Sequence, residues 1–212
     1  MTTAAWLLLG VAATLAVLDW LAVARGLRPL EYVAKPGATL ALALVAATLD
    51  PAYSDTRTLF VLALLASLAG DVFLMLPSDR FVPGLGSFFV AQLLYTVGFA
   101  LHGGSFVDYA IGAVIVTVLV VPLCRRFVGA LRRAGRDKLV APVLAYMGAI
   151  GAMATSAIAT GNVFAIVGAL FFVASDSLIA ETRFVGERPW GKVAIMVTYH
   201  LAQAGLVLSL LS

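Results

Sequence analysis

Long apolar runs alternate along the chain with short polar connections. A membrane-spanning helix needs about 17–25 mostly apolar residues, and eight segments satisfy that requirement. The pattern therefore predicts an all-α, polytopic bundle of eight transmembrane helices, organised as one domain over residues 1–212. We expect the helices at about Ala4–Ala24, Tyr32–Leu49, Thr58–Leu76, Pro83–Leu101, Phe106–Cys124, Leu139–Ala159, Asn162–Ala180 and Gly191–Leu211.

The composition places the chain in the membrane class. Hydrophobic residues make up 62% and charged residues 12%, with a mean hydropathy of +1.04, whereas about a quarter of the residues in a soluble domain are charged. The single cysteine, Cys124, excludes an intramolecular disulfide and cysteine-based zinc or iron–sulfur sites. No metal-ligand cluster is visible, and we expect no cofactor. The net charge of +3 does not indicate nucleic acid as a partner.

The basic residues segregate to one face of the predicted bundle. Thirteen of the fourteen Lys and Arg residues lie in or beside the first, third, fifth and seventh connections, and Arg57 lies on the opposite face. By the positive-inside rule these connections are cytoplasmic and both termini lie on the non-cytoplasmic side. We therefore expect a multi-pass protein of the bacterial plasma membrane, with residues 125–138 as its longest polar connection. The thirteen are Arg25, Arg28, Lys35, Arg80, Arg125, Arg126, Arg132, Arg133, Arg136, Lys138, Arg183, Arg188 and Lys192.

Two aspartates interrupt the apolar runs at matching positions. Asp71 in the third helix and Asp176 in the seventh each lie roughly 7–8 Å inside the helix end, at 1.5 Å per residue. An ionisable group at membrane depth is expensive, so it marks a functional site by default. Asp19 near the end of the first helix and Lys35 near the start of the second are further candidates. The alternative is structural: hydrogen bonds that hold the bundle, or anchoring of Asp19 and Lys35 at the headgroups.

Uncharged polar residues gather at similar depth on the fourth and eighth helices. Gln92 and Tyr95 are three residues apart, and Tyr199 and Gln203 are four apart, so each pair shares a helix face. His200 lies three residues before Gln203 and shares its face as well. Together with the aspartates, these positions predict a pocket open toward the cytoplasmic leaflet. For the tyrosines and His200, interior packing is the alternative interpretation.

A weak internal repeat relates the third and fourth helices to the seventh and eighth. Asp71 is followed by Arg-Phe-Val at 80–82, and Asp176 is followed by Arg-Phe-Val at 183–185. Tyr95 and Tyr199 then follow at nearly equal spacing. Parallel repeats of this kind occur in transporters.

Short motifs are spread in order over nearly the whole chain. They are Lys35-Pro36, Gly70-Asp71 with Leu74-Met75, then Phe81, Gly84, Phe88, Gln92 and Tyr95, then Gly168-Ala169, Phe172 and Ser175-Asp176, and finally Tyr199 with Ala202-Gln203. Together they resemble the motifs of one membrane-protein family, the YhhN family, which includes the lysoplasmalogenases. One departure is that the family usually carries histidine where this chain has Gln92; His200 is the nearby residue that would replace it.

The resemblance implies hydrolysis of the vinyl ether bond of lysoplasmenyl lipids, giving a fatty aldehyde and a glycerophospho-base. This reaction needs an acid that protonates the β-carbon and an anion that stabilises the resulting oxocarbenium ion. Asp71 and Asp176 are the natural pair for these tasks, and the sequence does not assign them. The substrate would be a single-chain lysophospholipid drawn from the bilayer, with Lys35 or Arg80 holding its phosphate. The oligomeric state is left open.

Two other functions are compatible with the same residues. The aspartates are also suited to relay protons in a non-enzymatic carrier or scramblase for a lipid or amphipathic solute. The exchange of histidine for Gln92 is compatible with an inactive lipid-binding relative.

Overall fold

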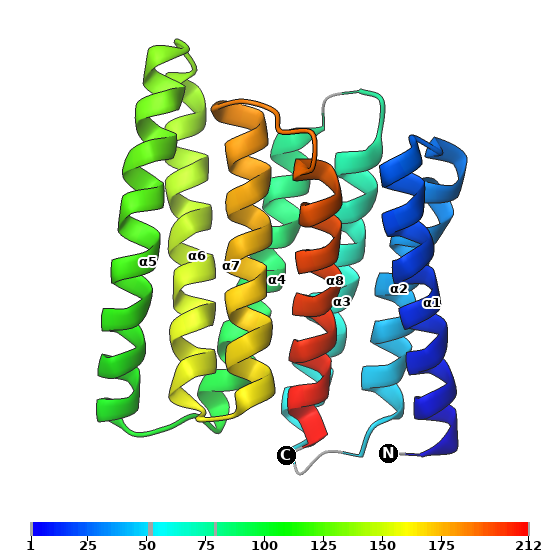
Figure 1. The fold of residues 1–212 in the computed structure, drawn as a ribbon. Coiled ribbons are helices and arrows are strands. Elements are labelled where there is room, and N and C mark those ends of the chain that lie inside the picture. Colours follow the sequence, from blue (N-terminus) through cyan, green and yellow to red (C-terminus); the bar gives the residue numbers. More distant parts are fainter. Residues whose placement is uncertain (1, 51–52, 79, 212) are drawn as a thin grey trace.

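The eight predicted spans are helices in the structure. The computed structural model describes residues 2–50, 53–78 and 80–211, and every regular element within them is helical (Figure 1). Eight helical segments are long and apolar enough to cross a membrane, which confirms the all-α, eight-span prediction. The helices are α1 (Thr3–Arg25), α2 (Arg28–Thr48), α3 (Ser54–Met75), α4 (Phe81–Leu101), α5 (Phe106–Arg133), α6 (Val140–Ala159), α7 (Val163–Phe184) and α8 (Gly191–Leu208), with 3₁₀ turns at Asp137–Leu139 and Ser209–Leu211.

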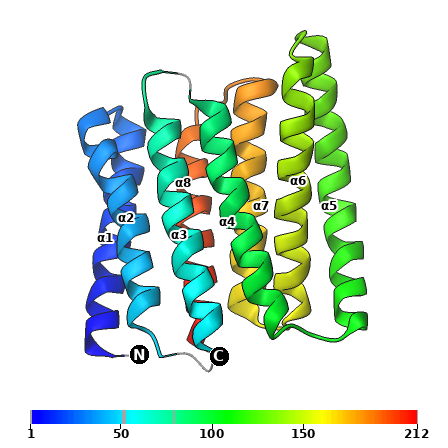
Figure 2. The same ribbon diagram turned by 180° about the vertical axis from the view of Figure 1, so that it is seen from behind.

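Seven helices close into a ring, and α5 packs outside it. Around the ring, each helix contacts the next in the order α1, α2, α3, α4, α6, α7, α8, and α8 returns to α1. The long helix α5 lies against α6 and α7 at one edge of the bundle (Figures 1 and 2). Between Tyr109 and Cys124 it carries no Asp, Glu, Lys, Arg or His. The ring interior is therefore the place where polar side chains can be shielded from lipid.

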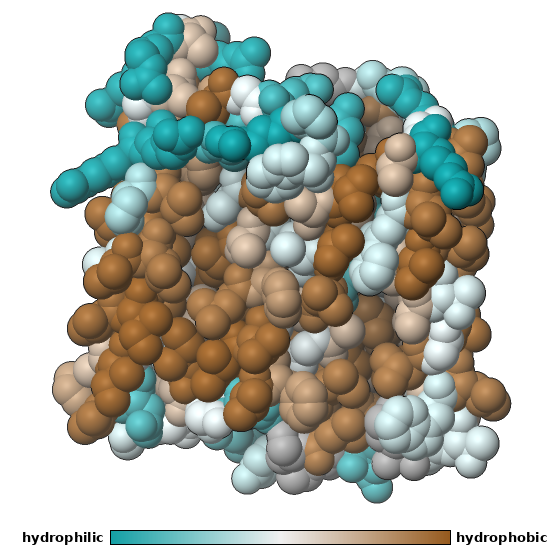
Figure 3. All heavy atoms as spheres, in the orientation of Figure 1, coloured by the Kyte–Doolittle hydropathy of each residue, from teal (hydrophilic) through white to brown (hydrophobic). Residues whose placement is uncertain are grey.

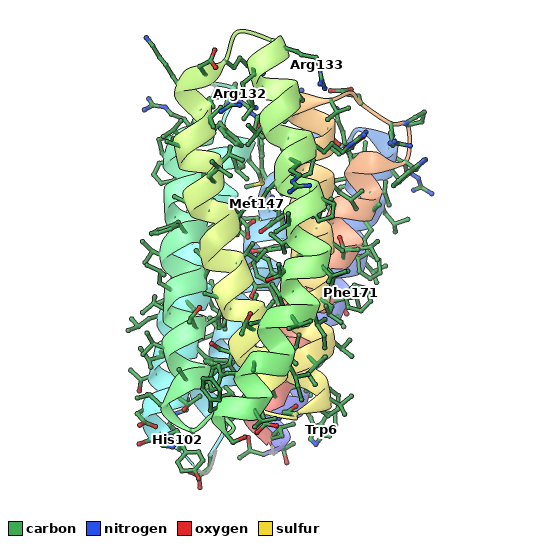
Figure 4. The ribbon with its side chains drawn as sticks, turned by 90° about the vertical axis from the view of Figure 1, so that its left-hand side faces the viewer. Trp6, His102, Arg132, Arg133, Met147 and Phe171 are labelled. Carbon is green, nitrogen blue, oxygen red and sulfur yellow. The ribbon has the colours of Figure 1, made fainter. Side chains whose placement is uncertain are left out.

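The two ends of the bundle differ in polarity. Hydrophilic side chains cluster at the end that holds the α1–α2, α3–α4, α5–α6 and α7–α8 connections, above a hydrophobic belt (Figure 3). Arg132 and Arg133 lie at this basic end, whereas Trp6 and His102 lie at the other (Figure 4). Both termini lie at the end opposite to Arg132 and Arg133 (Figures 1 and 4). That the basic end is the cytoplasmic one stays a prediction.

One predicted connection is largely helical. The polar stretch 125–138 was expected to be loop, but α5 continues through it to Arg133. The helix ends at Ala134, where Gly135 takes a positive φ of 66°. The prediction failed because it used apolarity to define the helix, whereas arginines are good helix formers once the helix leaves the bilayer. The other boundaries differ from the predicted ones by four residues or fewer.

Helices α7 and α8 meet at paired glycines. A Cβ added to Gly168 would lie 2.8 Å from the backbone nitrogen of Leu206, and one added to Gly205 would lie 2.8 Å from the Cα of Gly168. The two backbones are therefore in direct contact, as small residues allow in membranes. This crossing fixes the position of Asp176 on α7 relative to Tyr199 on α8.

Candidate active site

The first polar cluster of the ring interior is centred on Asp71 of α3. Its side chain is fully buried. From α2, Lys35 Nζ lies 3.2 Å from Asp71 Oδ1, and the Thr39 hydroxyl donates a hydrogen bond of 2.8 Å to Oδ2. From α8, the Tyr199 hydroxyl donates a hydrogen bond of 2.7 Å to the same oxygen. Three helices thus converge on one carboxylate, which is the pairing that a buried charge requires.

A line of hydrogen bonds leads from this cluster toward the end with the termini. Gln203 Nε2 donates to the Tyr199 hydroxyl at 3.2 Å, and Gln203 Oε1 accepts from the Tyr95 hydroxyl at 2.7 Å. Beyond them, the Phe60 ring packs edge-on against Tyr95, with the ring centroids 4.9 Å apart. Phe60 also lines a cavity of about 510 Å³ at that end, beside His102. The polar line therefore stops one aromatic ring short of this cavity.

The second cluster is centred on Asp176 of α7. The Tyr146 hydroxyl of α6 donates a hydrogen bond to Asp176 Oδ2, and Gln92 Nε2 of α4 lies 3.4 Å from that hydroxyl. Asp176 is half-buried and lines a cavity of about 40 Å³ between α3, α4, α6 and α7. Apart from Asp176 and Tyr146 this cavity is apolar, with walls that include Leu74 and Phe88. This aspartate therefore faces a hydrocarbon-like space.

An aromatic triad connects the two clusters. The rings of Phe88, Phe172 and Tyr199 are arranged edge to face, with centroids 5.9–6.4 Å apart. Phe88 lines the apolar cavity on one side and touches Tyr199 on the other. It fits only because residue 70 has no side chain: a Cβ on Gly70 would lie 2.6 Å from the Phe88 ring. The two carboxyl groups are close enough to interact electrostatically.

Asp19 of α1 is buried near the first cluster but forms no hydrogen bond with its described residues. Its side chain is fully buried, and neither of its carboxylate oxygens has a hydrogen-bond partner among the described residues. It interacts electrostatically with Lys35, Glu31 and Asp71. An unpartnered buried carboxyl group is energetically costly, so Asp19 is a functional candidate in its own right.

Two of the predicted residues, His200 and Arg80, lie outside both clusters, and Lys35 takes a different role from the one expected. His200 turns toward α1, where its Nδ1 accepts a 3.0 Å hydrogen bond from Trp20 Nε1. It has no hydrogen bond to Gln92 or to either central aspartate among the described contacts, so the structure does not place it where the family's histidine would lie. Arg80 is exposed just before α4, with its Nε 3.3 Å from the Ser78 hydroxyl. Lys35, expected to hold phosphate, is already paired with Asp71.

Two side chains of the site were missed by the sequence analysis. Thr39 lies one turn after Lys35 on the same face of α2, a spacing that should have singled it out. Tyr146 is a tyrosine deep in an otherwise apolar span. Its sequence neighbours carry no polar group, so only the packing of α6 between α4 and α7 shows its role.

Comparison with known proteins gives a consistent result. The YhhN family model matches residues 30–210 of this chain. A protein of Mycobacterium bovis named lysoplasmalogenase is 34% identical over 156 residues, covering 70% of this chain and 58% of that protein. Human lysoplasmalogenase TMEM86B is 32% identical over 149 residues, covering 70% and 62%. The Escherichia coli uncharacterized membrane protein YhhN is 40% identical over 70 residues, or 33% of each chain.

The match to the two lysoplasmalogenases is partial in length. The alignments span about three fifths of each of those proteins. No solved structure matches the chain.

Proposed function

This chain belongs to the YhhN family of membrane proteins, and from that premise we propose that it is a membrane-embedded ether hydrolase. Its substrate would be a single-chain lysoplasmenyl lipid, cleaved at the vinyl ether bond to a fatty aldehyde and a glycerophospho-base. The observation that carries the proposal is the pair of interior carboxyl groups in unlike surroundings, one ion-paired and one beside an apolar cavity. Two relatives with the name lysoplasmalogenase support it.

We assign the proton donor to Asp176. It lines the apolar cavity, whose hydrocarbon-like walls leave room for the few carbons nearest the vinyl ether bond, so the rest of an alkenyl chain would extend beyond it. Its hydrogen bond from Tyr146 engages only Oδ2, which leaves Oδ1 to carry a proton toward the substrate. Transfer of that proton to the β-carbon converts the vinyl ether into an oxocarbenium ion, and Asp176 is left as the carboxylate. Gln92, through Tyr146, positions this donor.

We assign the anionic role to Asp71. Lys35 forms an ion pair with Oδ1, while Thr39 and Tyr199 donate hydrogen bonds to Oδ2, and these contacts stabilise the ionised form. The negative charge stabilises the cation electrostatically and takes a proton from the attacking water. Water adds to the α-carbon, and the hemiacetal breaks down to the aldehyde and the free glycerol hydroxyl. As the hemiacetal collapses, its hydroxyl proton passes to Asp176, and Asp71 gives the proton that it took from water to the departing glycerol oxygen. One water is consumed, and both carboxyl groups return to their starting states.

Substitution of each aspartate tests this mechanism. We expect Asp71→Asn and Asp176→Asn to lower aldehyde release from lysoplasmenyl lipid by about 10²–10⁴-fold, because acid–base assistance is lost. Asp137→Asn, at the basic end and outside both clusters, is the matched control and should leave the rate unchanged. Monodispersity in detergent establishes that the variants fold. Full activity in either aspartate variant would remove the two-carboxyl mechanism.

A proton-linked carrier is the second candidate. The observation that favours it is the hydrogen-bonded line from Asp71 through Tyr199 and Gln203 to Tyr95, which approaches the cavity at the opposite end. Reconstitution into liposomes separates the two functions. An enzyme releases aldehyde without net lipid or proton movement, whereas a carrier moves its solute in response to a pH gradient without forming product.

We further propose that the protein resides in the bacterial plasma membrane with its basic end in the cytoplasm. The segregation of lysines and arginines to the odd-numbered connections supports this orientation. The substrate would then enter from the cytoplasmic leaflet.

A further inference from the structure

A polar cavity opens at the basic end of the ring and plays no part in the mechanism so far. It has a volume of about 560 Å³ and is bounded by the α1–α2 connection, the end of α3 and the start of α8. Its volume falls within the range of small-molecule sites, which is about 300–1,000 Å³. We call this cavity the vestibule.

The vestibule lies directly above the Asp71 cluster. Its wall residues Glu31, Met75 and Ile195 belong to α2, α3 and α8. One helical turn deeper, the same three helices carry Lys35, Asp71 and Tyr199 in turn, each four residues away from its wall residue. On α1, Val23 lines the vestibule and Asp19 lies one turn deeper. The catalytic cluster that we propose, together with Asp19, therefore lies buried one helical turn below the residues that line the vestibule.

The vestibule is lined by charges of both signs that have no protein partner. Arg28 and Lys192 stand on its walls with Glu31. Among the described residues, none of these three side chains forms an ion pair or a hydrogen bond. At the same end, Arg126 and Arg188 both contact Glu181, at 2.6 and 3.4 Å. Other charged side chains there, such as Lys138 and Glu187, also form no ion pair among the described residues, and the vestibule differs from them in lying one helical turn above the Asp71 cluster. Free cations and a free anion around one cavity match a ligand that carries both charges.

We propose that the vestibule binds the headgroup of a zwitterionic lysophospholipid, an inference that rests on the function proposed above. Arg28 and Lys192 bind the phosphate, since guanidinium and ammonium groups are the usual phosphate donors. Glu31 binds the headgroup ammonium, with Tyr32 offering its aromatic face to the same cation.

Leu74 forms the partition between headgroup and chain. It lines both the vestibule and the apolar cavity beside Asp176. A lysolipid with its headgroup in the vestibule and the first carbons of its chain in the apolar cavity would therefore cross the wall at Leu74. Leu74 lies one helical turn from Asp71 on α3, and Asp176 lines the apolar cavity on its other side, so both carboxyl groups flank this crossing.

Binding of a lipid that cannot react tests the headgroup site separately from catalysis. The probes are 1-alkyl lysolipids that lack the vinyl double bond, with either a phosphoethanolamine or a bare phosphate headgroup, titrated calorimetrically into purified protein. We expect the wild type to bind the phosphoethanolamine lipid more tightly. The double variant Arg28→Ala/Lys192→Ala should weaken both lipids by about tenfold or more, because each loses charge-assisted hydrogen bonds.

Glu31→Gln should act on one lipid only. We expect it to weaken the phosphoethanolamine lipid by about tenfold and to leave the bare phosphate lipid unchanged, since only the former has an ammonium group. The controls are Arg136→Ala/Lys138→Ala and Glu187→Gln, which change the same residue types at the same end but outside the vestibule. These should stay within about twofold of wild type, the change expected of exposed charges.

The outcomes are distinguishable. The headgroup site is overturned if neither probe binds, if the vestibule variants match their controls, or if Glu31→Gln weakens both lipids equally. If the headgroup effects hold while wild-type protein releases no aldehyde from the vinyl ether lipid, the hydrolase proposal fails and the binding site remains.

Discussion

The two interior aspartates occupy corresponding helices but opposite kinds of environment. Asp71 is fully buried and takes contacts from Lys35, Thr39 and Tyr199. Asp176 is half-buried, accepts one hydrogen bond from Tyr146, and otherwise faces apolar walls. The two aspartates thus lie in similar apolar sequence contexts, but the side chains that contact them in the folded protein differ. In our mechanism this difference is what separates the anion from the acid.

The different contacts of the two aspartates do not follow the internal repeat that relates α3 and α4 to α7 and α8. If the two helix pairs were equivalent units, each aspartate would meet the tyrosine of the other pair. Asp71 does contact Tyr199, but Asp176 contacts Tyr146 of α6, and Tyr95 instead joins Gln203. The insertion of α6 between α4 and α7 breaks the equivalence. The repeat motifs do meet at the basic end, where the rings of Phe81 and Phe184 pack edge to face.

The largest stability difference is expected from removing the cation of the first cluster. Lys35→Met would leave Asp71 as an uncompensated buried charge and lower the free energy of unfolding by about 3–5 kcal/mol. Adding Asp71→Asn to that variant should restore much of the loss, because the unpaired charge disappears. Asp176→Asn should cost far less, because Asp176 forms no ion pair with any cation among the described residues. Thermal unfolding in detergent measures the stability of the three variants. Equal losses for Lys35→Met and Asp176→Asn would show that the two aspartates do not differ in how they are stabilised.

Removing one tyrosine hydroxyl from each cluster sharpens the comparison. Tyr146→Phe leaves the half-buried Asp176 and the Gln92 amide without this hydroxyl, and we expect aldehyde release to fall about tenfold with a smaller loss of stability than for Tyr199→Phe. Tyr199→Phe strands polar groups of the fully buried Asp71 and Gln203, so it should lower the free energy of unfolding by about 1–3 kcal/mol. The measurements are initial rates and thermal melts on both variants. A reversed order of the two stability effects would contradict the assignment.

The boundary between the clusters is tested by a change in packing alone. Gly70→Ala places a Cβ 2.6 Å from the Phe88 ring, which must shift, and we expect a loss of about 1–3 kcal/mol from overpacking. Gly86→Ala on α4 is the control, since nothing lies within 4 Å of the added Cβ. It should be neutral or slightly stabilising, because alanine favours helix over glycine. Indistinguishable unfolding temperatures would show that Phe88 is not held tightly between the clusters.

The sequence by itself determined the membrane class, the eight spans and the segregation of basic residues to one end. These are local properties: the length and apolarity of a run decide whether it can cross hydrocarbon, whatever its neighbours are. It also singled out Asp71, Asp176 and the polar residues around them, because an ionisable residue within an apolar run can be recognised from the sequence alone. The sequence did not predict the last turns of α5, because the prediction relied on apolar runs and these turns are rich in arginine.

The tertiary structure decided which of those residues meet. The exclusion of α5 from the ring brings α6 beside α4, and with it Tyr146 to Asp176. The orientation of α2 about its axis pairs Lys35 with Asp71, and the orientation of α8 directs His200 toward Trp20 of α1. Spacing along one helix fixes which side chains share a face but says nothing about where that face points. Direction is set by packing between helices, at contacts such as Gly168 against Gly205, and only the folded ring contains that information.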